Sequence, residues 1–171
     1  DITGAIALPN AKTGVFVNGA TNAMIGGTAA GAGNLISGNA MQGVLVTGAA
    51  MNASVLGNSI VGNGALGIDL GTAGNTGNDA LDGDSGPNGL QNYPIIASTS
   101  DVCGNATVHG TLNSSPSSTY LIEVFTNTAC DPSTFGEGQA LLGTLTATTD
   151  VNGDATFALP LGVPLPLGAF L

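Results

Sequence analysis

The sequence lacks arginine and tryptophan, and its one lysine is outnumbered by 11 acidic residues, which gives a formal net charge of -10. This balance disfavours nucleic acid and anionic membrane surfaces as partners, because both attract proteins through clustered basic side chains. No apolar run approaches the roughly 18 residues of a membrane-spanning segment, so we expect no membrane insertion.

Charged residues of either sign are scarce, at 7%, whereas 43% of residues are hydrophobic and 28 are glycine. Plentiful aliphatic residues argue against intrinsic disorder. The sequence shows no initiator methionine, signal peptide or transit peptide, and we expect a mature or trimmed product. Its two cysteines, in a chain rich in glycine and asparagine, indicate an oxidising compartment, so we expect an extracellular or cell-surface location.

Short apolar runs recur through the first 70 residues. The run at 43–46 follows a similar run at 14–17 by 29 residues and precedes another at 67–70 by 24. Each run is too short and too rich in glycine for a helix, and its aliphatic residues alternate as in a half-buried strand. Parallel stacking would superpose these residues inside: Val15, Val44 and Ile68; Val17, Val46 and Leu70; Ile36 and Ile60; and Ile25 and Val55. The outward positions would be Phe16, Leu45 and Asp69.

Asparagine repeats with the same spacing. Asn34 and Asn58 are 24 residues apart, as are Asn39 and Asn63. Asparagine tolerates the left-handed backbone conformation of a tight corner, and stacked asparagines pass amide hydrogen bonds from one strand level to the next. We expect two ladders of this kind, with three strands in each repeat.

The segments Ala5-Ile-Ala-Leu-Pro-Asn10, residues 23–39 and Gly67-Ile-Asp-Leu70 resemble the right-handed parallel β-helix repeats of large bacterial secreted and surface proteins, in the pectate-lyase-like superfamily. The resemblance covers about residues 3–92. It implies an all-β fold with a short β-helix at 1–92, then an Ig-like β-sandwich at 93–171. In that family pattern one more strand would follow Phe170.

Antiparallel strands are expected after Pro94. Residues 105–112 and 119–127 flank a Ser/Pro turn, and 141–149 and 155–161 flank Asn152-Gly153, a strong hairpin signal. Both pairs are predicted as hairpins. Cys103 and Cys130 lie almost symmetrically about the first turn, which predicts a disulfide, with free thiols or metal ligands as alternatives.

A long loop without periodicity, residues 71–92, separates the two halves, and loops of this length are often functional. Asp79, Asp82, Asp84 and Asn88 could surround calcium with oxygen ligands, although their spacing is not that of an EF-hand. A solvated acidic loop without metal is the alternative.

Other motifs predict less. Asn113 is the best placed of three glycosylation sequons, which also begin at Asn52 and Asn105. The glycines of 62–67 lack the following helix that dinucleotide binding needs. Gly83-Asp-Ser-Gly resembles a serine-protease segment, but the only histidine, His109, follows it in a predicted strand.

These observations favour a non-enzymatic structural or adhesive module, a subunit of a surface fibre. An uncovered first strand and the apolar stretch 159–171 predict self-association or covalent continuation at both ends. The alternatives are a large-adhesin fragment or a protein that binds or cleaves surface polysaccharide. A polysaccharide-active protein should present a groove lined with carboxylates and aromatic rings.

Overall fold

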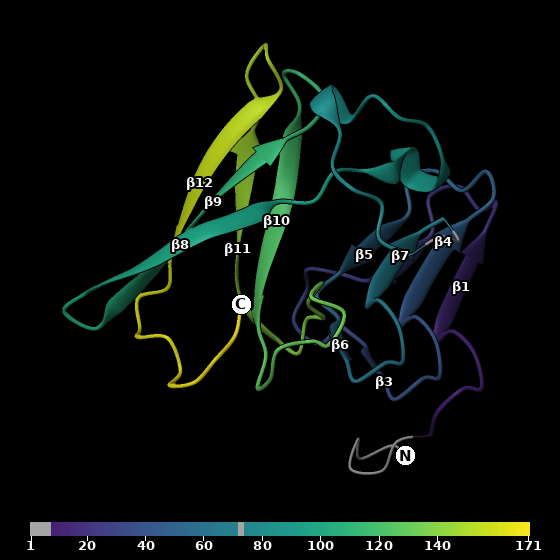
Figure 1. The fold of residues 1–171 in the computed structure, drawn as a ribbon, viewed down its shortest axis with the longest axis horizontal. Helices are drawn as coiled ribbons and strands as arrows, with labels where there is room; N and C mark the ends of the chain where they lie inside the picture. The colour runs from purple at the N-terminus through teal and green to yellow at the C-terminus, as the bar shows by residue number, and fades with distance from the viewer. Residues whose placement is uncertain (1–7, 72–73) are drawn as a thin grey trace.

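The computed structural model describes residues 8–71 and 74–171, and it is an all-β structure. Short parallel strands from the first half of the chain lie on one side of the molecule, and longer antiparallel strands lie on the other (Figure 1). The loop at 74–94 connects them and carries two short 3-10 helices, η1 (Ala80–Asp82) and η2 (Pro87–Leu90).

The parallel strands form three small sheets with the predicted register. The three-stranded sheet has the order β1 (Val15–Asn18), β4 (Val44–Thr47), β7 (Ile68–Leu70). The two-stranded sheets pair β2 (Met24–Gly26) with β5 (Ser54–Leu56), and β3 (Leu35–Ser37) with β6 (Ser59–Val61). Val15 pairs with Val44 and Val44 with Ile68, while Ile36 pairs with Ile60 and Ile25 with Val55. The four predicted pairings are confirmed.

The predicted right-handed parallel β-helix is not found, and the resemblance to that family is wrong. Within residues 8–71 and 74–171, the sheets are separate, contain two or three strands each, and do not form a closed or solenoid sheet. Each strand position recurs only two or three times, so every parallel sheet ends almost as soon as it begins.

Burial within the parallel strands agrees with the predicted alternation except at β7. Val17, Val44, Val46, Ile36 and Ile60 share one buried cluster.

Ile68, predicted inside, is 45% exposed, and Asp69, predicted outside, is only 2% exposed. Asp69 lies on the same face as Leu45, its neighbour across the sheet, and η2 lies against both β4 and β7. The loop therefore covers a face that the strand pattern alone leaves open to solvent.

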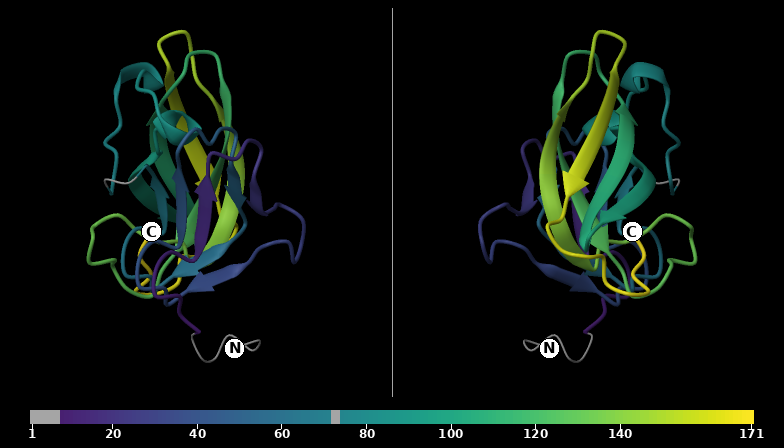
Figure 2. Two further views of the ribbon diagram at one scale, coloured as in Figure 1. Left: turned by 90° about the vertical axis from the view of Figure 1, so that its right-hand side faces the viewer. Right: turned by 90° about the vertical axis from the view of Figure 1, so that its left-hand side faces the viewer.

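The antiparallel strands form two sheets around a second core. One sheet has the order β12 (Asp154–Pro160), β9 (Asn105–Asn113), β8 (Ile95–Val102), and the other pairs β10 (Thr119–Thr126) with β11 (Ala140–Thr148). Their shared core contains Val108 from β9, Ile122 and Val124 from β10, and Phe157 from β12. Figure 2 shows the two sheets facing each other.

Both predicted hairpins are wrong. The turn at 113–118 leads from β9 in one sheet to β10 in the other, and the turn at 149–153 leads from β11 back to β12. A turn signal indicates that the chain reverses, but it does not determine whether the next strand pairs with the previous one. Here the chain crosses the core instead.

Candidate functional site

The asparagine ladders are present in the form predicted. The backbone N–H and side-chain Nδ2 of Asn34 both donate to Oδ1 of Asn58, at 3.0 and 2.9 Å. Asn39 donates in the same way to Oδ1 of Asn63, at 3.1 and 2.8 Å. The second ladder begins earlier, because Asn10 donates through both of its nitrogens to Oδ1 of Asn39. Each ladder therefore runs in one direction, from donor to acceptor along the stack.

Two glutamates from the antiparallel half complete the last level of the parallel strands. Glu137 accepts hydrogen bonds from the backbone N–H of Gly62 and from both nitrogens of Asn63, the side chain at 2.8 Å. Glu123 accepts from the backbone N–H of Gly57 with both carboxylate oxygens, at 3.0 and 2.9 Å. Neither partner could be predicted from the sequence, because the donors lie 66 to 75 residues away from the glutamates.

Backbone contacts reinforce these glutamate contacts. The N–H of Ile60 donates to the carbonyl of Gly138 at 2.8 Å, and the Ser59 hydroxyl donates to the carbonyl of Gln139 at 2.6 Å. Residues 137–139 thus occupy the edge of β6 where a further parallel strand would lie. This attachment fixes the antiparallel half against the end of the parallel strands.

Beside this attachment, a groove runs along the open edge of β10. It consists of two adjoining hollows of about 490 and 830 Å³, and both are lined by Val55, Ile68, Tyr93, Ile122 and Phe125. Ile122 and Phe125 point to opposite faces of β10, so the groove follows the strand's edge rather than one of its faces. We call this feature the β10 groove.

Core residues of the antiparallel half line the β10 groove. Val124 and Phe157 belong to the buried core and also border the groove, as does Ile96 of β8. Every residue of β8 is exposed, although Ile95 and Ile96 are apolar. In the described part of the chain, β10 pairs only with β11, so its other edge has no strand beside it. The edges of β8 and β10 are therefore not paired, and the groove lies between the two sheets at these edges.

The last residues of the chain lie at one end of the β10 groove. Phe170 and Asn127 exchange two backbone hydrogen bonds, of 3.0 and 2.8 Å, as an antiparallel bridge just beyond the end of β10. Leu171 packs against the antiparallel core and borders the groove. The 127 end of the groove is thus closed, and among the described residues none pairs with the edge of β10 from Thr126 back toward Thr119.

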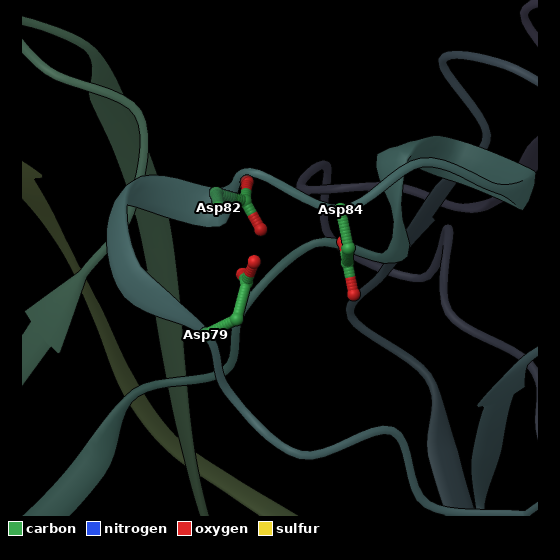
Figure 3. Close-up of side chains that lie close together, drawn as sticks. All are labelled: Asp79, Asp82 and Asp84. Atoms are coloured by element: carbon green, nitrogen blue, oxygen red, sulfur yellow. The ribbon is translucent and has the colours of Figure 1, made fainter.

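The predicted calcium ligands come together only in part (Figure 3). Asp79, Asp82 and Asp84 each place one carboxylate oxygen within 4.8 Å of the others, a donor set that suits a hard cation. Burial and the neighbouring charges of Asp79 and Asp82 raise the pKa of Asp84.

Several oxygens of the predicted calcium site already accept protein hydrogen bonds. Asp82 accepts from the Asn92 N–H and the Ser114 hydroxyl, and Asp79 accepts from the Gly83 N–H. The fourth predicted ligand is wrongly placed, because Oδ1 of Asn88 accepts from the N–H of Ala53 at 2.6 Å, on the parallel strands.

The predicted disulfide is not formed in this structure, and both thiols are free and exposed. Cys103 lies in the turn between β8 and β9, and Cys130 follows β10. The prediction assumed that β9 and β10 form a hairpin, whereas they belong to different sheets. The predicted glycosylation site also has a defined setting. Asn113 ends β9, where its Nδ2 donates to Asp154 and its Oδ1 accepts from the N–H of Leu81.

Two further polar groups have settings that the sequence did not indicate. Oδ2 of buried Asp69 accepts from Nε2 of Gln42 at 3.0 Å, whose own Oε1 accepts from the Thr13 hydroxyl, whereas Oδ1 of Asp69 has no partner among the described residues. Nε2 of His109 lies 3.0 Å from the hydroxyl of Ser100 on the neighbouring strand. The histidine therefore pairs with Ser100 and not with the serine of the protease-like segment.

No protein-family model matches this chain, and no curated protein matches its sequence. Among the described residues, no helix has the length and apolar character needed to cross a membrane.

Proposed function

We propose that this chain is a non-enzymatic structural subunit that assembles with other polypeptide by β-strand addition. One observation carries the proposal: no described strand pairs with the edge of β10 opposite β11, and the β10 groove along that edge opens onto the core of the antiparallel half. An open edge offers unpaired N–H and carbonyl groups, and an adjacent apolar slot adds side-chain contacts to them.

The arrangement of the carboxylates supports a structural role. Glu123 and Glu137 are the acidic residues that line the 490 Å³ part of the β10 groove, and both accept hydrogen bonds from backbone N–H groups of the parallel half. A catalytic pair needs carboxyl groups that are free to exchange protons with a substrate. These two serve to hold the halves together.

An extracellular or surface location fits this role, because a durable fibre subunit benefits from a rigid β structure with few basic residues. The alternative role is polysaccharide binding. It is favoured by one observation, the edge-to-face pair of Tyr93 and Phe135 beside the groove, with ring centroids 6.3 Å apart. Exposed rings of this kind can stack on sugars, and quenching of tyrosine fluorescence by soluble glycans would detect it.

The assembly proposal is tested on the purified chain. Light scattering after size exclusion, native mass spectrometry and electron microscopy should show species larger than one chain that grow with concentration. They should also grow with salt, since screening reduces repulsion between copies of net charge -10. A monomer under all these conditions contradicts the proposal.

A matched pair of variants links assembly to the groove. Ile96→Lys places a charge on the groove wall and should abolish the larger species. Val151→Lys makes the same kind of change at an exposed residue of the turn between β11 and β12 that does not line the groove, and should assemble normally. Equal behaviour of the two variants would show that assembly does not use the groove.

A further inference from the structure

Asp69 is the only charged residue in the described part of the chain whose side chain is buried, with 2% of its surface exposed. Its Oδ2 accepts a hydrogen bond of 3.0 Å from Nε2 of Gln42, and no group of the described residues pairs with its Oδ1. A neutral amide does not neutralise a carboxylate, and an uncompensated charge is costly to bury. Asp69 therefore has one oxygen and its negative charge left for a partner.

The described residues do not place a cation beside Asp69. No basic residue borders either hollow of the β10 groove in this part of the chain. The sequence has no arginine, and its one lysine, Lys12, is exposed. The only histidine, His109, lies on β9 and pairs with Ser100. The positive charge that would compensate Asp69 therefore has to come from a ligand.

The larger hollow of the β10 groove, of about 830 Å³, brings Asp69 within reach of such a ligand, because Asp69 is one of the residues that line it. Gln42, which holds Oδ2, does not line the hollow, so Oδ1 is the oxygen left on the side of the hollow. Leu70 of β7 and Leu90 of η2 also line it, and Thr76 adds a hydroxyl group. The hollow thus combines one carboxylate with apolar walls.

We propose that this hollow binds an alkylammonium ion, with the ammonium group on Asp69 and the hydrocarbon chain against the apolar walls. The ammonium group supplies both the charge and the hydrogen-bond donors that Oδ1 lacks, and Thr76 can accept a further hydrogen bond from it. A bare calcium ion fits less well, because it needs about six to eight oxygen ligands. Amine binding does not require assembly, although an added strand would compete for the same hollow.

Intrinsic fluorescence can report binding, because the chain has no tryptophan and both of its tyrosines, Tyr93 and Tyr120, line the larger hollow. Titration of the chain with n-pentylamine at neutral pH, at a concentration where the chain is monomeric, should change this fluorescence and saturate. The uncharged n-pentanol, with the same hydrocarbon chain, should bind at least about tenfold more weakly. Equal affinity for the two compounds, or no saturation with n-pentylamine, would overturn the proposal.

A matched pair of variants tests the assignment to Asp69. Asp69→Asn keeps the shape of the side chain and an oxygen for Gln42 but removes the charge, and it should weaken n-pentylamine binding by about tenfold. Asp101→Asn removes the same charge from an exposed residue that does not line the groove, and it should bind as the unmodified chain does. Equal affinities of the two variants would refute the assignment. The comparison of amine with alcohol uses the unmodified chain and so does not depend on the folding of a variant.

Metal ions are tested alone, as the chlorides of sodium, potassium and calcium. If one of these salts changes the fluorescence of the unmodified chain but not that of Asp69→Asn, and n-pentylamine has no effect, Asp69 binds a metal ion and the proposal is wrong. The outcome is separate from that for assembly, which is measured by light scattering. A chain that binds n-pentylamine and remains monomeric contradicts assembly alone, and a chain that assembles without binding the amine contradicts this site alone.

Discussion

Replacing Glu137 tests the attachment between the two halves most directly. Its carboxylate accepts from three donors, namely the N–H groups of Gly62 and Asn63 and the side-chain Nδ2 of Asn63. A hydrogen bond to a charged acceptor contributes roughly 1.5–3 kcal/mol, but Gly62 is exposed and water can replace its partner. We therefore expect Glu137→Ala to lower the free energy of unfolding by about 2 kcal/mol, and Glu137→Gln to lower it by about 1 kcal/mol, because glutamine keeps one acceptor oxygen.

These losses are large enough to measure by circular dichroism during thermal and urea unfolding. For a chain of this size, about 2 kcal/mol corresponds to a decrease in Tm of about 4–8 °C. Asp84→Asn is the control, since it also removes one negative charge but lies in the acidic loop. It should leave Tm unchanged or raise it, because the surroundings of Asp84 already disfavour its charged form. If Glu137→Ala melts with the unmodified chain, the carboxylate does not hold the two halves together.

Three other predictions concern the loops. If the loop at 79–84 binds calcium, Tm should rise with added calcium and fall with a chelator. The double substitution Asp79→Asn with Asp82→Asn should remove both responses. An unchanged Tm in the unmodified chain would indicate a solvated acidic loop without metal. Thiol titration of the native protein should find two reactive groups, from Cys103 and Cys130, whereas none before reduction would restore the predicted disulfide. Hydrogen bonds from the backbone N–H groups of Asp154 and Asn152 lower the pKa of Asp150. The ionised Asp150 carboxylate therefore stabilises the fold above the ordinary aspartate pKa, and this stabilisation is lost as pH falls through the pKa of Asp150 in the folded protein. Asp150→Ala should reduce the dependence of unfolding free energy on pH in the acid range, and an unchanged slope would contradict this.

The parallel register could be predicted from the sequence because it depends on a spacing that repeats along the chain. Gly43 and Gly67, and Asn39 and Asn63, share one offset, and a strand placed by that offset brings Val44 beside Ile68 without further information. The hydrogen bonds of Asn34 and Asn39 follow from the same offset.

Contacts without such an offset could not be predicted. Glu123 and Glu137 show no periodicity with Gly57 or Asn63, so their role depends on how the two halves of the chain meet. The burial of Asp69 depends on η2, which comes from a loop with no pattern of its own. The sheet to which each of β9 to β12 belongs depends on whether the chain passes from one sheet to the other at each turn, and the turn sequences do not determine this. The over-extended resemblance to a β-helix had the same origin, since a repeat predicts neighbours but not the number of levels.

The direction of the asparagine ladders has a consequence for how such a chain can change its length over evolution. Every level donates to the next through the same two nitrogens and accepts through the same oxygen, so duplicating or deleting one 24-residue unit between Asn39 and Asn63 would leave each junction chemically identical. A carboxylate cannot donate, and Glu137 therefore ends the series wherever it docks. Because Glu137 accepts from the last asparagine of this ladder, we expect insertions of whole units to be tolerated where insertions of other lengths are not.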